Sequence, residues 1–123
     1  MYRDVAHITD SMLCDLKEAL KGAAWKENKA KDRHYFTYFV SDRRFFLKIP
    51  PGGKVHKHTD TPRPTETYHI PIQTNDRSVC YMFEPDKTAY HLEVGKVYWV
   101  NRDIPHESIN SGTTDRIHYL IEC

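Results

Sequence analysis

The sequence predicts an all-β protein, a double-stranded β-helix (cupin-type jelly roll) with one N-terminal α-helix packed on the sheet. One amphipathic segment near the N-terminus is followed by about eight short segments rich in aromatic and β-branched residues, with turn-forming residues between them. The 123 residues suit a single compact domain with one core. We expect residues 1–34 to form the helix and a linker, and residues 35–123 to form the jelly-roll core.

The predicted helix is indicated by apolar residues that recur at three- and four-residue steps between residues 8 and 24. Thr9 or Asp10 would cap its N-terminus, and Gly22 lies near its expected C-terminal end. Its apolar face must lie against another element. The charged run 26–33 that follows is interpreted as a solvated linker or a frayed helix end rather than a binding patch.

The expected strands are separated by residues that favour turns, among them the PPGG segment 50–53 and the Ser-Gly pair 111–112. This punctuation is typical of successive antiparallel strands. The turn at 50–53 also precedes a further strand, the end of which would carry His58 and Asp60. The eight predicted segments are 35–40, 44–49, 67–73, 78–83, 88–92, 96–100, 107–110 and 116–122.

Alternation along two of these strands predicts which side chains face the interior of the barrel. In 67–73, His69 lies on the face opposite the flanking tyrosine and isoleucines. In 116–122, Arg116 and His118 likewise oppose an apolar face. We assign the apolar faces to packing under the helix, so the two histidines and the arginine would point into the barrel mouth.

The charge balance and the cysteines limit the class of protein. A net charge of +1, from 18 basic and 17 acidic residues, argues against a dedicated nucleic-acid binder. The first ten residues lack the apolar region of a signal peptide, and no stretch is long enough to cross a bilayer. Cys14, Cys80 and Cys123 form no disulfide framework or metal knuckle. We expect a cytoplasmic protein without a nucleic-acid or membrane partner.

Two histidines and an aspartate predict a metal site. His58 and Asp60 share one face because they are two residues apart on a strand, and His106 would return on another strand. Two imidazoles and one carboxylate can fill one face of an octahedral metal and leave the other face open, as in non-haem Fe(II) oxygenases. His56 is an alternative ligand, but we interpret it as an exposed or supporting group because using it would leave Asp60 unexplained.

Arg116 follows His106 by ten residues and indicates an anionic co-substrate. A guanidinium inside a barrel needs an anion, and a carboxylate bound by two hydrogen bonds is the best geometric match. The alternative is an ordinary surface ion pair with Asp115 or Glu122. The alternation of Arg116 with apolar residues argues against that alternative.

These motifs together resemble the aspartyl/asparaginyl β-hydroxylase family of Fe(II)/2-oxoglutarate-dependent oxygenases. The resemblance covers roughly residues 45–121 and depends on fairly specific spacing. It is carried by the PGGKVHKHTD segment 51–60, His69, the EVGKV segment 93–97, His106 and Arg116.

The resemblance implies a role for each of these residues. His58, Asp60 and His106 would hold Fe(II) as the catalytic centre, Arg116 would bind the distal carboxylate of 2-oxoglutarate, and His69 would lie near that co-substrate. The implied reaction hydroxylates an unactivated C–H bond of an amino acid, peptide or small molecule. O2 is consumed and 2-oxoglutarate is converted to succinate and CO2.

Three positions differ from the pattern of some or all family members. Family members that act on peptide domains carry an arginine where this chain has Thr67, and some of them lack the metal carboxylate that Asp60 supplies here. The chain therefore looks closer to the smaller microbial members, and a peptide aspartate or asparagine is not the expected substrate by default. Family members often carry a hydroxyl that shares the distal carboxylate of 2-oxoglutarate with the arginine. The corresponding position here is Leu47, which has no hydroxyl, so the sequence does not place this partner.

Weaker candidates lie in loops. Thr61, Arg63, Thr65 and Glu66 follow the metal carboxylate, where a lid could cross the open face, although a solvated loop explains them equally well. Arg63 would suit an acidic substrate. The segment 101–103 is interpreted as a turn rather than a site.

Two other functions remain open at this point. Gly95, His106 and Asn110 have the spacing of the second cupin motif, although Asn101 and Asp103 replace its proline and second glycine. A metal-dependent cupin enzyme without 2-oxoglutarate, an isomerase or a dioxygenase, is therefore the first alternative. A non-catalytic jelly-roll binding module is the second. A domain this short could also gain walls for its site by forming a homodimer.

Overall fold

The fold is taken from a computed structural model that describes residues 1–60 and 66–123. Within these residues eleven antiparallel strands form one curled sheet, in the order β1-β9-β6-β11-β4-β3-β5-β10-β7-β8, with β2 paired to β3. The elements are β1 (Tyr2–His7), α1 (Asp10–Ala19), β2 (Lys26–Ala30), β3 (Arg33–Ser41), β4 (Arg44–Ile49), β5 (Lys54–His58), β6 (Thr67–Gln73), β7 (Ser78–Met82), β8 (Thr88–Tyr90), β9 (Lys96–Val100), β10 (His106–Asn110) and β11 (Arg116–Glu122).

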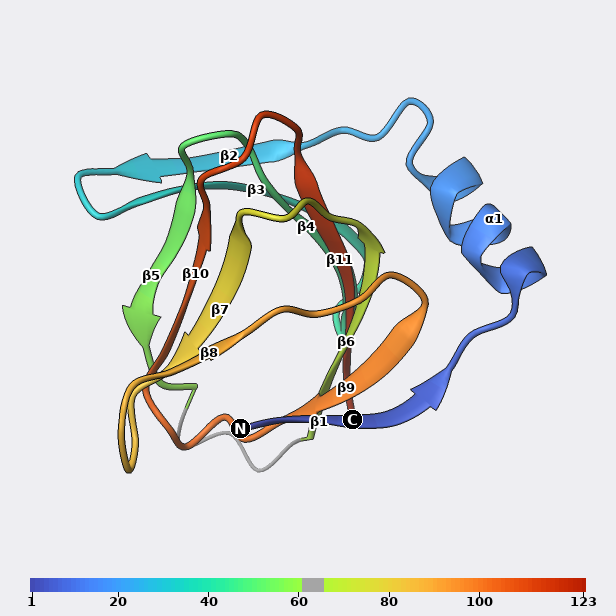
Figure 1. Cartoon of the computed structure of the whole chain (residues 1–123). Coiled ribbons are helices and arrows are strands. Elements are labelled where there is room, and N and C mark those ends of the chain that lie inside the picture. The colour runs from blue at the N-terminus through green and yellow to red at the C-terminus, as the bar shows by residue number, and fades with distance from the viewer. Residues whose placement is uncertain (61–65) are drawn as a thin grey trace.

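The predicted jelly roll is confirmed. The sheet curls so that β5, β10, β7 and β8 face the group that runs from β4 through β11 and β6 to β9 and β1 (Figure 1). A β3–β5 bridge between His34 and Lys54 joins the two sides. Because β10 pairs with both β5 and β7, a strand late in the chain returns beside an early one. This return is what a double-stranded β-helix supplies.

The predicted packing of the helix on the sheet is also confirmed. α1 begins after Thr9, whose hydroxyl accepts a hydrogen bond from the Met12 backbone N–H at 3.1 Å. Leucines of this segment pack against a cluster of buried apolar residues on the sheet. None of the described helices is long and apolar enough to cross a bilayer. The cluster contains Phe46, Ile70, Ile72, Ile117 and Tyr119, with Leu13 and Leu16 of the helix and Leu20, its C-cap residue, against it.

The expected linker at 26–33 was wrong, because residues 26–30 form β2 and pair with β3. All five β2 side chains are exposed, so no hydrophobic alternation marks the strand, and its hydrogen bonds to β3 define it instead. A second strand went unpredicted at Tyr2–His7, which pairs with β9. Segment 1–34 therefore adds two strands to the sheet besides the helix.

Candidate metal centre

His58 and His106 come together because their strands are neighbours. β5 and β10 pair in a register that sets the two residues directly opposite each other, and their ring centroids are 4.4 Å apart. Asp60 follows β5 by two residues. One ligand atom from each of these three residues lies within 4.8 Å of the other two. The structure thus brings together the three predicted metal ligands.

Backbone carbonyls fix the orientation of both imidazoles. Nδ1 of His58 lies 2.6 Å from the His56 carbonyl oxygen, and Nδ1 of His106 lies 2.8 Å from the Ile104 carbonyl oxygen. A carbonyl can only accept, so both Nδ1 atoms carry the proton and donate it. Nε2 of each ring then faces Asp60, where a protonated Nε2 can donate to the carboxylate and a deprotonated Nε2 can bind a metal. A histidine anchored through one nitrogen and free at the other is the form that binds a metal.

The Asp60 carboxylate lies between the two Nε2 atoms. The Nε2–Oδ distances are 3.4 Å to His58 and 3.2 Å to His106. Burial opposes ionisation of the carboxyl, but the hydrogen bonds from His106 and His58 outweigh it and hold the Asp60 pKa well below its usual range. The hydrogen bond with Asp60 raises the pKa of His58 in return, against the effect of burial. A metal bound here would take the place of a proton.

Arg116 begins β11 and is only 3% exposed. Its Nη2 lies 2.6 Å from Nδ1 of His118 and 3.6 Å from the Cys80 sulfur. Among the described residues, no carboxylate lies within 4.0 Å of this guanidinium. The surface ion pair with Asp115 or Glu122 that could have explained Arg116 is therefore not formed.

Two neutral histidines surround this arginine. The arginine can only donate, so Nδ1 of His118 is an acceptor, and Nδ1 of His69 at 3.1 Å donates to the same atom. Burial, followed by the Arg116 charge, lowers the pKa of both histidines well below the usual range. The inward orientation predicted for His69, Arg116 and His118 is thus observed. The arginine contributes a buried positive charge that its protein neighbours do not balance.

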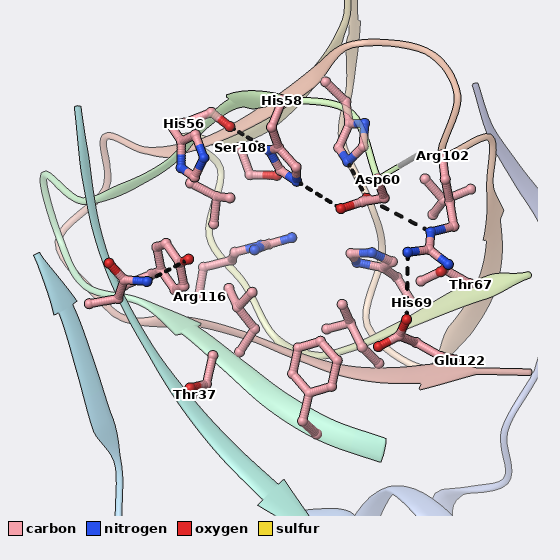
Figure 2. A pocket seen from close by; sticks show the side chains of 18 of the residues that line it. Thr37, His56, His58, Asp60, Thr67, His69, Arg102, Ser108, Arg116 and Glu122 are labelled. Atoms are coloured by element: carbon pink, nitrogen blue, oxygen red, sulfur yellow. Dashed lines mark hydrogen bonds and ion pairs between the residues drawn. The ribbon is translucent and has the colours of Figure 1, made fainter. Parts of the chain in front are cut away.

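One cavity of about 780 Å³ contains the three predicted metal ligands and Arg116. Figure 2 shows His58 and Asp60 along one side, the Arg116 guanidinium pointing toward the centre, and His69 across from the metal ligands. Leu47 lines the cavity and offers no hydroxyl, so it is not the missing partner of the arginine. Ser108 lines the cavity as well, and its Oγ donates to the Cys80 sulfur that Arg116 also contacts.

Three residues of the cavity wall were missed by sequence reasoning. The segment 101–103 is a turn, as expected, but the Arg102 side chain is 7% exposed and lies 3.9 Å from Asp60. Glu122 is 9% exposed and lies 3.5 Å from Arg102. Alternation along β11 places Glu122 on the same face as Arg116, a signal that was available. Tyr2 reaches the cavity from the unpredicted β1.

The remaining candidates occupy different places. His56 lines the cavity outside the group of three ligands, and its backbone carbonyl orients His58, in keeping with a supporting role. Thr61, Arg63 and Thr65 lie outside the described residues. Glu66 is exposed, accepts a hydrogen bond from the Tyr68 hydroxyl and does not line the cavity. The hydroxyl of the cavity residue Thr67 is buried without a hydrogen-bond partner among the described residues.

Solved structures share this fold at low sequence identity. A prolyl-4-hydroxylase from Pseudomonas putida aligns with a TM-score of 0.76 and 12% identity over 97% of this chain and 89% of that one. A predicted oxalate decarboxylase from Thermotoga maritima aligns with a TM-score of 0.61 and 13% identity, over 83% of this chain and 93% of the other. A cupin domain from Bordetella pertussis aligns with a TM-score of 0.55 and 19% identity, over 77% of this chain and 96% of the other. These similarities support the jelly-roll fold.

Sequence comparison identifies the family. No curated protein sequence matches the chain. The family model described as aspartyl/asparaginyl beta-hydroxylase matches residues 19–123, which include every strand from β2 to β11 and all the site residues predicted from the sequence. The chain therefore belongs to the aspartyl/asparaginyl β-hydroxylase family.

Proposed function

We propose that the chain is an Fe(II)- and 2-oxoglutarate-dependent dioxygenase that hydroxylates an unactivated C–H bond of an amino acid, a peptide or another small molecule. One observation carries this proposal: the cavity that contains the three ligands His58, Asp60 and His106 also contains the guanidinium of Arg116. The first group suits a divalent metal, and the second suits the carboxylate of an organic co-substrate. Their presence in one cavity supports a reaction that needs both.

The three ligands fit Fe(II) by their chemistry. His58 and His106 can each present Nε2 as a nitrogen ligand, because a carbonyl holds Nδ1, and Asp60 presents an ionised carboxylate at neutral pH. Thiolates are absent from this group of ligands, as expected when the metal is catalytic iron rather than structural zinc. Bound iron would supply the activation of O2, with 2-oxoglutarate oxidised to succinate and CO2 and the second oxygen atom transferred to the substrate C–H bond.

Arg116 would bind the distal carboxylate of 2-oxoglutarate. A dicarboxylate can reach from this buried guanidinium toward the metal ligands within the same cavity. We assign Ser108 as the hydroxyl that joins the arginine, because both contact the Cys80 sulfur. His69 lies beside His118 and would limit the space around the co-substrate. Because His69 and His118 stay neutral, the charge of Arg116 remains available to an anion.

The alternatives account for less of the site. A cupin enzyme that uses only the metal would leave the buried charge of Arg116 without a ligand. A non-catalytic binding module would explain neither the anchored imidazoles nor the ionised aspartate between them. We also propose a reducing, cytoplasmic location, which the three free thiols favour.

The test is turnover of 2-oxoglutarate by the purified full chain. With Fe(II), ascorbate and O2, we expect succinate to form, and we expect His106→Ala and Arg116→Met to abolish it. Arg44→Met, which removes an exposed arginine outside the cavity, is the matched control and should turn over at the unchanged rate. Lack of 2-oxoglutarate binding by the Fe(II)-loaded chain under anaerobic conditions would refute the proposal even if no prime substrate is known.

A further inference from the structure

Arg102 joins the metal site to the last strand. Its side chain is 7% exposed and lies between two carboxylates, with Nε 3.9 Å from Oδ2 of Asp60 and Nη2 3.5 Å from Oε2 of Glu122. Figure 2 shows the three side chains as a row that closes the side of the cavity away from Arg116. The row therefore ends at a predicted metal ligand.

The backbone makes a second link between the same two residues. The backbone N–H of Asp60 donates to the Arg102 carbonyl at 3.1 Å, so the end of β5 is attached to the turn after β9. That turn is closed by the Asp103 N–H, which donates to the Asn101 side-chain oxygen at 3.2 Å. Main chain and side chain of Arg102 thus both act on Asp60, which lies beyond the end of its own strand.

Glu122 supplies a negative charge beside Arg102. A lone cation beside a metal site would repel the metal, but the Glu122 carboxylate balances the charge of Arg102. The planar guanidinium can face two carboxylates at once, which a lysine ammonium does less well. Arg102 can therefore restrict the rotation of Asp60 with little net repulsion of a cation.

We infer that Arg102 is a positioning residue that holds the Asp60 carboxylate toward the metal. The inference rests on the proposed function, since it requires that His58, Asp60 and His106 bind a divalent ion. Groups that orient metal ligands without touching the metal commonly change metal affinity by about 10- to 100-fold when they are removed. Arg102 belongs to this class because it contacts the ligand carboxylate and its own partner Glu122.

The experiment is a titration of the full chain with Mn(II), followed by the electron paramagnetic resonance signal of the free ion. Arg102→Met should raise the Mn(II) Kd by about 10- to 100-fold. Arg102→Lys should recover part of the loss, because it restores the charge without the planar fork. Asp103→Asn is the matched control, since it changes an exposed side chain of the same turn and keeps the backbone N–H that closes the turn, and its Kd should stay within about twofold of the unchanged chain.

Equal or tighter Mn(II) binding by Arg102→Met would overturn the inference, because the arginine would then only repel the ion. If that variant does not fold, Glu122→Gln decides the question. It should weaken Mn(II) binding several-fold, and unchanged binding would overturn the inference. Failure of the unchanged chain to bind Mn(II) is a separate outcome, which would overturn the proposed metal centre and this inference with it.

Discussion

Two arginines are buried in the wall of one cavity, but their surroundings differ. Arg116 contacts an imidazole nitrogen and a thiol sulfur, whereas Arg102 lies between the carboxylates of Asp60 and Glu122. A buried charge is costly unless it is paired. Carboxylates balance the charge of Arg102, whereas among the described residues no carboxylate balances the charge of Arg116. The burial of an arginine therefore does not by itself indicate an anion site. The arginine must also lack a carboxylate neighbour.

The largest expected effect is the loss of 2-oxoglutarate binding in Arg116→Met. Removing one partner of a buried, hydrogen-bonded charge pair costs roughly 4 kcal/mol, or about a thousandfold in affinity. Isothermal titration of the Mn(II)-loaded protein with 2-oxoglutarate measures it. Mn(II) affinity itself should change little, because Arg116 does not contact the three ligands. A loss of both affinities together would remove the distinction between the two arginines.

Stability without ligands should show the opposite ranking. Arg102→Met leaves the buried Glu122 carboxylate and the partly exposed Asp60 carboxylate without their shared cation and should reduce the free energy of unfolding by about 3 kcal/mol. Arg116→Met removes a cation that the protein does not balance, so it should leave the free energy of unfolding unchanged or raise it. Urea unfolding of the metal-free proteins gives both values. Equal destabilisation by the two substitutions would contradict the comparison.

The two ends of the cavity should also differ in their response to pH. Asp60 raises the pKa of His58, and a proton there competes with the metal. Mn(II) affinity should therefore fall by up to about tenfold per pH unit below that raised pKa, and reach its plateau above it. His69 and His118 have lowered pKa values and stay neutral over the same range. At saturating metal, 2-oxoglutarate affinity should consequently remain flat, and a parallel fall would place a titrating group beside Arg116.

The smallest expected effect concerns the Ser108 hydroxyl, which we assign as the partner of Arg116 in binding 2-oxoglutarate. Ser108→Ala should weaken 2-oxoglutarate binding by about 1 kcal/mol, or roughly fivefold, the usual worth of one hydrogen bond. The cavity residue Thr37 provides the comparison, because it lies on β3, which pairs with β4 and not with the Ser108 strand β10. If Thr37→Ala has the larger effect on the dissociation constant, the hydroxyl partner has been assigned to the wrong strand.

The sequence predicted the fold because alternation and turn residues are local signals. The same alternation placed His69, Arg116 and His118 on the inner face, and spacing brought His58, Asp60 and His106 together. β1 and β2 escaped prediction because their side chains are mostly exposed and only pairing with neighbours makes them strands.

Arg102 escaped for a related reason. It lies in a turn without periodicity, and its place in the cavity wall is fixed by contacts with Asp60 and Glu122, which are distant in sequence. Glu122 was on the correct face by alternation but was considered only as a surface partner of Arg116. Which charges pair across a cavity depends on the curl of the sheet, and a single sequence does not encode this in a local pattern.

The central claim is that one cavity binds a metal and a dicarboxylate at separate protein groups. A crystal structure of the full chain, soaked anaerobically with Fe(II) and 2-oxoglutarate, tests it most directly. We predict iron among His58, Asp60 and His106, with one carboxylate of 2-oxoglutarate against the guanidinium of Arg116. Iron bound elsewhere, or a co-substrate that does not touch Arg116, would contradict the account.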